Sequence, residues 1–99
     1  MIDGIFDPAM SSLEKGIKNA VKAQEVIAQN IANANTPNYY AKKFDEVLEK
    51  EVQRRDVPGV NLEEEMADQA KNSGKHAAYI KLLLSKLSIL RTIITQGRK

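Results

Sequence analysis

Apolar residues recur with a period of about 3.5 residues in the first third of the chain. The seam consists of Met10, Leu13, Ile17, Ala20, Gln24, Ile27, Ile31 and Ala34. This spacing is typical of a helix that packs along a partner helix as a coiled coil. Asp7 and Pro8 suit an N-cap and a first helical position, and Thr36 leaves the α region because it precedes Pro37. The pattern predicts a helix over residues 8–35.

A second seam of the same period fills the last third of the chain. It consists of Leu62, Met66, Gln69, Ser73, His76, Ile80, Leu83, Leu87, Leu90 and Ile94. Asn61 is a good N-cap, and the three glutamates of residues 63–65 suit the positive end of a helix dipole. Gly97 is a suitable stop. We therefore predict a second helix over residues 61–96.

The middle segment, residues 36–60, has a different character. It is bounded by turn signals at Pro37-Asn38 and Pro58-Gly59. Apolar residues lie at helical spacing within it, namely Tyr40, Phe44, Val47, Leu48 and Val52. These favour a short amphipathic helix near residues 41–54 or a loop, and no substantial sheet.

Together these elements predict an all-α fold in a single domain of residues 1–99. The two long helices would form an antiparallel hairpin or coiled coil, with the short middle segment at one end. Two helices alone enclose little core, because each seam covers only the other and the shoulders stay exposed. The sequence therefore indicates a subunit that completes its core by assembling with other chains.

Composition narrows the chemistry. The chain has no cysteine and one histidine, which excludes disulfides, thiolate metal sites and a multi-histidine site within one chain. Fifteen basic and thirteen acidic residues are intermixed, giving a net charge of +2 rather than the one-signed stripe of a nucleic-acid binder. We expect no catalytic residues, metal, cofactor, small-molecule substrate or nucleic-acid partner.

The opening residues, MIDGIFDPAM, lack the basic and apolar regions of a secretory signal peptide. The longest apolar run is also far shorter than the roughly 20 residues that span a bilayer. We expect a soluble protein that either stays in the cytoplasm or leaves by a route without a cleaved signal.

The stretch ANANTPNY carries a resemblance to a known family. It is similar to the A-N-x-x-T-P-G-Y signature of bacterial flagellar rod and hook proteins, through Ala32, Asn33, Asn35, Thr36, Pro37, Asn38 and Tyr39. The preceding VIAQNIAN and the C-terminal helix resemble the same proteins, so that the similar segments cover about two-thirds of the chain. The short middle segment leaves no room for an outer domain, which favours the proximal rod proteins of the basal body.

The resemblance implies a fold, partners and a location. The terminal helices would form a coiled coil that polymerises with copies of itself and with other rod and basal-body proteins, and the rod would transmit torque. Family members leave the cytoplasm through the flagellar export apparatus without a cleaved signal peptide and assemble in the periplasm. Asn38 stands where the family has glycine, and Asn is the next most tolerant residue for positive φ, so that a type II turn survives.

Several residues allow two interpretations. The amides of Asn30 and Asn33 bond either to neighbouring chains or to the turn. His76 would lie near Gln24, as a polar pair that sets the register or, alternatively, as a pH switch. The residues that we expect to carry the assembly seam are Leu13, Ile17, Ile27, Ile31, Ile80, Leu83, Leu87 and Leu90. The rival function is a small helical adaptor or chaperone that binds a partner helix.

Overall fold

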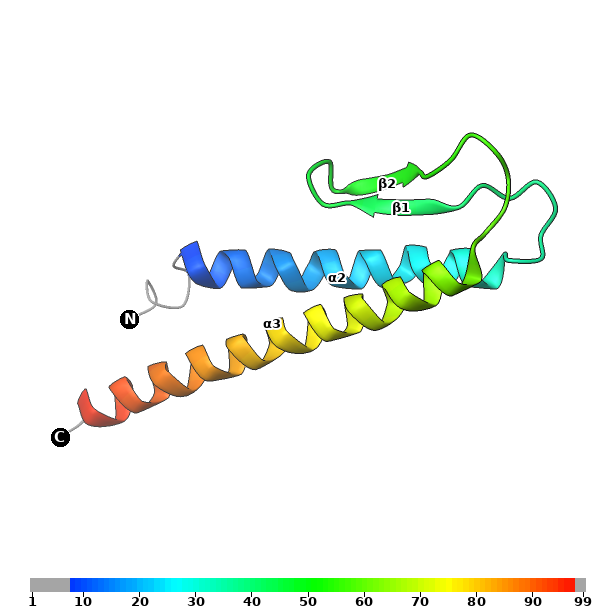
Figure 1. Cartoon of the computed structure of the whole chain (residues 1–99). Helices are drawn as coiled ribbons and strands as arrows, with labels where there is room; N and C mark the ends of the chain where they lie inside the picture. The colour runs from blue at the N-terminus through cyan, green and yellow to red at the C-terminus, as the bar shows by residue number, and fades with distance from the viewer. Residues whose placement is uncertain (1–7, 98–99) are drawn as a thin grey trace.

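The computed structural model describes residues 8–97; the expected N-cap Asp7 lies outside them. Helix α2 spans Pro8–Ala32, strands β1 and β2 span Lys42–Asp45 and Lys50–Gln53, and helix α3 spans Leu62–Gly97. The long helices run antiparallel, and the two strands form a hairpin that folds back along α2 (Figure 1). The start of α2 and the end of α3 therefore lie at the same end of the molecule.

The predicted helices are present, with small shifts at their ends. Helix α2 stops at Ala32, three residues before the predicted end, because the chain tightens there: Ala34 N–H donates to the Ile31 carbonyl at 3.2 Å. Helix α3 begins after Asn61, whose Oδ1 accepts a hydrogen bond from Glu64 N–H at 3.1 Å. This is the N-cap that the sequence predicts.

The middle segment is a β-hairpin, so the predicted helix near residues 41–54 and the all-α class are wrong in this part. Strands β1 and β2 pair antiparallel, with Lys42 opposite Gln53 and Asp45 opposite Lys50. Asp45 Oδ1 accepts hydrogen bonds from the backbone N–H groups of Val47 and Leu48 at 2.9 and 3.0 Å. Such local bonds turn the chain and compete with a helix.

The core is small and the molecule is long. The buried apolar side chains are Met10, Ala20, Val26, Ile27, Ala41 and Phe44. The radius of gyration is 18.3 Å and the extents are 66 × 22 × 14 Å, whereas a compact chain of this length would have a radius of gyration of about 13 Å. The fold is therefore a thin rod-shaped hairpin with most of its surface open.

Candidate assembly surfaces

Helix α2 buries the face that its heptad pattern predicts. Met10, Ala20 and Ile27 are buried, and Leu13, Ile17, Gln24 and Ile31 are half-buried. Ala34, which follows the helix, is also half-buried. This face of α2 packs against α3, so within one chain the first seam is already partly occupied.

Helix α3 meets α2 on a face that is rotated from the predicted one. The residues nearest α2 include Glu65 and Asn72, which are buried, and Tyr79, whose ring lies against Gly16. Several predicted seam residues are exposed instead, namely Leu62, Met66, Ser73, Leu87 and Ile94. Gln69, His76, Ile80, Leu83 and Leu90 are half-buried. The rotation follows from hydrogen bonding: Asn72 Nδ2 donates to the Ala20 carbonyl at 2.8 Å.

A buried polar cluster joins the helices to the hairpin. Asn30 is fully buried; its Nδ2 donates to the Lys42 carbonyl at 2.7 Å and to Glu65 Oε1 at 2.8 Å. Its Oδ1 accepts from Lys42 N–H at 3.0 Å and from the Tyr39 hydroxyl at 3.1 Å. Within the single chain, the amide of Asn30 thus bonds to the turn, to the start of the hairpin and to α3.

Arg54 completes this cluster from the end of the hairpin. Its guanidinium pairs with Glu64 and Glu65, and lies 3.8 Å from an Asp68 carboxylate oxygen. Glu65 is only 1% exposed, so its carboxylate depends on Asn30 and Arg54 for compensation. Sequence reasoning assigned the glutamates to helix capping alone. The available signal was the basic pair Arg54-Arg55 facing three consecutive glutamates across a short connection.

The family-like turn has the backbone geometry that its sequence predicts. Asn38 has φ of 60°, and Tyr39 N–H donates to the Thr36 carbonyl at 3.4 Å. Pro37 at the second position and a positive φ at the third are typical of a type II turn. Asn33 links the turn to α2, because its Nδ2 donates to the Gln29 carbonyl and its Oδ1 accepts from the Thr36 hydroxyl. Asn35 is exposed.

His76 and Gln24 lie beside one another, as the hairpin register predicts. Both line a shallow groove of about 380 Å³ along the junction of α2 and α3, together with Ala20, Val21, Glu25, Ala28 and Ser73. Gln24 Oε1 accepts from Asn72 Nδ2 at 3.3 Å. The polar pair thus adjoins the hydrogen bonds that fix the helix register.

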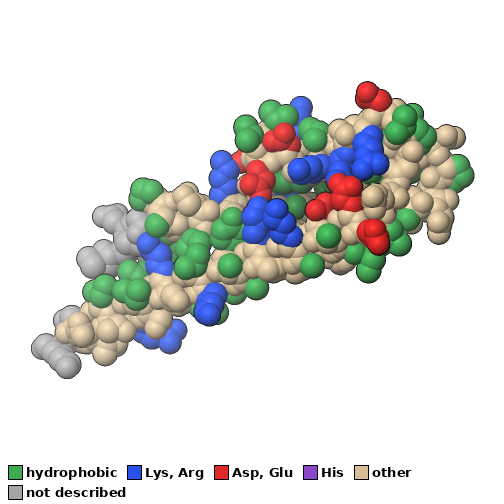
Figure 2. Space-filling model, viewed as in Figure 1, with side chains coloured by type: hydrophobic (Ala, Val, Ile, Leu, Met, Phe, Trp, Pro, Cys, Tyr) green, Lys and Arg blue, Asp and Glu red, His purple; other side chains and the backbone are tan. Residues whose placement is uncertain are grey.

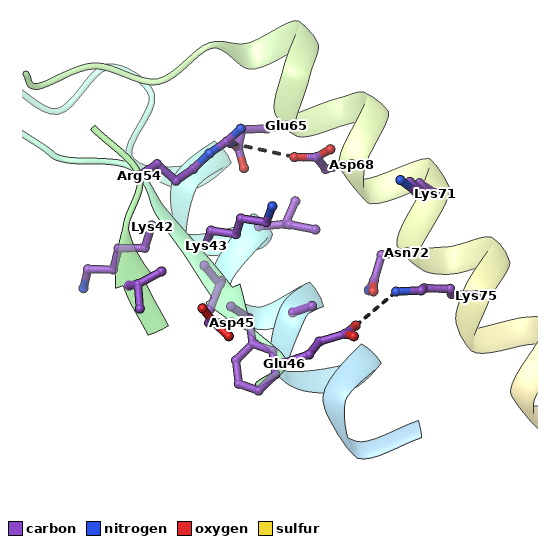
Figure 3. Close-up of a pocket in the computed structure, with 15 residues that line it drawn as sticks. Lys42, Lys43, Asp45, Glu46, Arg54, Glu65, Asp68, Lys71, Asn72 and Lys75 are labelled. Atoms are coloured by element: carbon purple, nitrogen blue, oxygen red, sulfur yellow. Dashed lines mark hydrogen bonds and ion pairs between the residues drawn. The ribbon is translucent and has the colours of Figure 1, made fainter. Parts of the chain in front are cut away.

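A second cleft lies between the hairpin and the helices (Figure 3). It measures about 460 Å³, with Val26, Ile27 and Phe44 among its apolar lining. Ion pairs close both ends of it: Arg54 with Asp68 at one end, and Glu46 with Lys75 at 3.0 Å at the other. The hydrogen bond that Lys75 donates to the Glu46 carboxylate raises the pKa of Lys75. These contacts attach the hairpin to α3.

Among residues 8–97, no element covers the far end of α3 to a comparable degree. Helix α3 has 36 residues and α2 has 25, a difference of about 16 Å at 1.5 Å per residue. The last turns of α3 expose Leu84, Ile89, Ile93 and Ile94 to between 47% and 61%. Figure 2 shows apolar side chains at the surface at this end of the molecule as well as along its length. A helix that is apolar on several sides is normally buried in an assembly.

Residues 8–97 contain no helix long and apolar enough to cross a membrane. In the same range, no three His, Cys, Asp or Glu side chains are grouped to hold a metal ion. The polar side chains that the fold brings together instead join one element to another. Fold and surfaces together define an elongated helical hairpin whose second helix exposes apolar side chains at its far end.

Comparison with known proteins shows which family the chain resembles. Residues 10–39 match the model of the flagella basal body rod protein family. The chain is also 26% identical over 127 aligned residues to the flagellar basal body rod protein FlgB of Bacillus subtilis strain 168, covering 95% of this chain and 98% of the relative. The chain is therefore similar to the flagellar basal body rod proteins, which are structural components of the rod, over the α2 region by the family model and over most of its length by the relative.

The alignment also shows a difference in length. Since 95% of 99 residues is about 94, the 127 aligned positions leave about 33 without a counterpart in this chain. The family match ends at residue 39, just after the turn. The matched region therefore covers the seam of α2, Asn30 and the turn motif.

Proposed function

We propose that this chain is a structural subunit of the proximal flagellar rod, which polymerises through its terminal helices and transmits torque. The observation that carries the proposal is the exposed apolar end of α3, where Ile89 is 61% and Ile93 is 55% exposed. Burial of one such side chain contributes about 1.5–3 kcal/mol. Neighbouring subunits that cover this end would supply the core that one chain lacks.

The architecture suits a load-bearing tube. Two helices locked in register by Asn72 and by the Asn30 cluster resist sliding along their common axis. Chains joined by their terminal helices would pass torque through packed side chains rather than through single loops. The short hairpin in place of an outer domain supports the proximal rather than the distal rod.

We further propose the partners and the route. The partners would be copies of this chain and other rod and basal-body proteins, and the location would be the periplasmic rod. The chain would reach the periplasm through the flagellar export apparatus, without a cleaved signal peptide. Similarity to the rod family supports each of these assignments.

The test is genetic. We expect a strain of the source organism that lacks the gene to be non-motile, with basal bodies that stop before the rod, and the intact gene to restore swimming. Electron microscopy of isolated basal bodies gives the direct readout. Complete rods and normal swimming in the deletion strain would rule out the rod assignment and favour the helical adaptor.

Polymerisation through α3 is tested by Leu87→Asp. Leu87 is 41% exposed on the apolar end of α3, so a carboxylate there would be buried without a partner in the assembly. We expect loss of rods and of swimming. The matched control is Ala78→Asp, on the exposed face that also bears Lys81 and Ser85; it should leave swimming intact. Normal swimming with Leu87→Asp would contradict assembly through this helix.

A further inference from the structure

The hairpin tip presents two adjacent apolar side chains to solvent. Val47 is 91% exposed and Leu48 is 56% exposed, at the turn between β1 and β2. The turn is built rather than loose: the Asp45 carboxylate accepts from both of their N–H groups, and Glu49 closes the turn with φ of 55°. Two large apolar side chains at an exposed tip bury little surface within residues 8–97.

Ion pairs anchor the tip to both helices. Glu49 pairs with Lys15 of α2 at 2.9 Å, and Glu46 pairs with Lys75 of α3 at 3.0 Å. These contacts hold Val47 and Leu48 in one position before any partner binds. Preorganisation of this kind reduces the entropy that is lost on association.

The groove beside His76 lies on the other side of the helix pair. Residues turn by about 100° each along a helix, so Val21 and Ala28, which line the groove, point about 140–160° away from Ala23 and Val26. Ala23 and Val26 line the cleft between α2 and the hairpin, together with Phe44. The tip and the groove therefore belong to opposite faces of one molecule.

The groove fits an apolar tip in its lining and in its charge. The groove is hollow because the side chains of Ala20 and Ala28 are small, and Val21 is 45% exposed at its edge. Glu25 stands on its rim, and Lys50 follows the tip on β2. Neither of these charged groups has an ion-pair partner among residues 8–97, so they can pair with each other between two chains.

We propose that Val47 and Leu48 of one copy insert into the groove formed by Ala20, Val21 and Ala28 of a second copy, with Lys50 paired to Glu25 across the interface. Because tip and groove lie on opposite faces, the contact is heterologous and repeats from copy to copy instead of closing a two-fold dimer. The proposal rests on the proposed function, in which copies of this chain lie side by side in the rod.

Disulfide trapping tests the contact directly, since the chain has no cysteine of its own. The variant Val47→Cys with Ala28→Cys, produced in motile cells and mildly oxidised in isolated basal bodies, should give a ladder of cross-linked copies on non-reducing gels. The matched control is Val47→Cys with Ala78→Cys, which places the second thiol on an exposed face outside the groove. Equal yields from the two variants would overturn the proposal, as would linkage only to a different rod protein.

A charge reversal provides the second measurement. Lys50→Glu should lower the fraction of swimming cells at least tenfold. Adding Glu25→Lys should restore that fraction, because the pair is re-formed with opposite signs. Both residues are exposed, so neither change should alter the circular dichroism of the purified chain. Normal swimming of Lys50→Glu and of Val47→Asp, in a background where deletion of the gene abolishes rods, would refute the tip contact and leave the rod function standing.

Discussion

At the end where the chain turns, Asn30 and Glu65 are almost wholly buried and each is hydrogen-bonded, whereas at the other end of α3 Ile89 and Ile93 are more than half exposed. The first end contains polar groups that water cannot reach. The second contains apolar groups that water surrounds. Both arrangements are unfavourable unless compensated.

The two ends differ in where the compensation comes from. Every buried side-chain nitrogen and oxygen in residues 8–97 has a hydrogen-bond partner within the chain, so the turn end is complete by itself. No element of residues 8–97 covers the far end of α3 to a similar degree (Figure 1). The comparison separates folding from the proposed assembly: the turn end sets the register of one chain, and in the proposed rod the far end of α3 would provide surface for neighbouring chains.

The largest expected effect on the single chain comes from Asn30→Ala. The substitution removes four hydrogen bonds and leaves the Tyr39 hydroxyl, the Lys42 amide and Glu65 without this partner. We expect a loss of about 3 kcal/mol in the free energy of unfolding, measured by urea denaturation followed by circular dichroism. In a chain with so small a core, this change should detach the hairpin as well.

The control for that prediction is Asn33→Ala, one turn further along. Both hydrogen bonds of the Asn33 side chain are exposed to solvent, so its loss should cost less than about 1 kcal/mol. Similar effects of the two alanine variants would show that the buried cluster does not hold the turn end together.

The sequence predicted the long helices, their antiparallel pairing and the positive φ of Asn38 correctly, because each rests on local signals. Heptad spacing, Asn61 and Thr36-Pro37 specify these features within a few residues. The hairpin was missed because Phe44, Val47, Leu48 and Val52 satisfy helical spacing, while the deciding contacts are the turn bonds of Asp45. Spacing alone cannot separate the two alternatives over so short a segment.

The face of α3 was misplaced for a different reason. The prediction assumed that apolar residues such as Met66 face the partner helix, but Met66 is 57% exposed and its neighbour Glu65 is buried. Glu65 is buried because Asn30 and Arg54, distant in sequence, provide its partners. Such pairing is a tertiary property, and no periodicity within α3 reveals it.

The next largest effect should come from alanine substitutions at two glycines, Gly16 at the contact between α2 and α3 and Gly74 outside that contact. A Cβ added at Gly16 would lie 2.9 Å from the Tyr79 ring, whereas one added at Gly74 meets nothing within 4 Å. Gly74→Ala should therefore stabilise the chain by up to about 1 kcal/mol through helix propensity. Gly16→Ala should destabilise it by about 1 kcal/mol, because overpacking exceeds that gain.

Thermal unfolding of the two glycine variants sharpens the comparison between the ends. The opposite signs of the two shifts depend on α2 and α3 touching at Gly16, on the way to the open end. Stabilisation by Gly16→Ala would mean that the helices have already separated there, and that the unfinished surface extends further along both of them.

The smallest effect concerns the anchor of the hairpin tip. The hydrogen bond and charge of Lys15 lower the pKa of Glu49, so the pair favours the folded state above the ordinary carboxyl pKa. This contribution is lost as the pH falls through the lowered value. The Lys75–Glu46 pair, which raises the pKa of Lys75, behaves oppositely in alkali: its contribution is full below the ordinary lysine pKa and declines as the pH rises through the raised value. Near neutral pH both anchors are therefore intact.

In acid, amide chemical shifts of Val47 and Leu48 should move with the titration of Glu49, and Glu49→Gln should remove that part of the movement. Glu14→Gln, a change of the same kind on α2, serves as the control and should leave it in place. Equal movement of the tip shifts in Glu49→Gln and in the unmodified chain would mean that the Lys15–Glu49 pair does not anchor the turn.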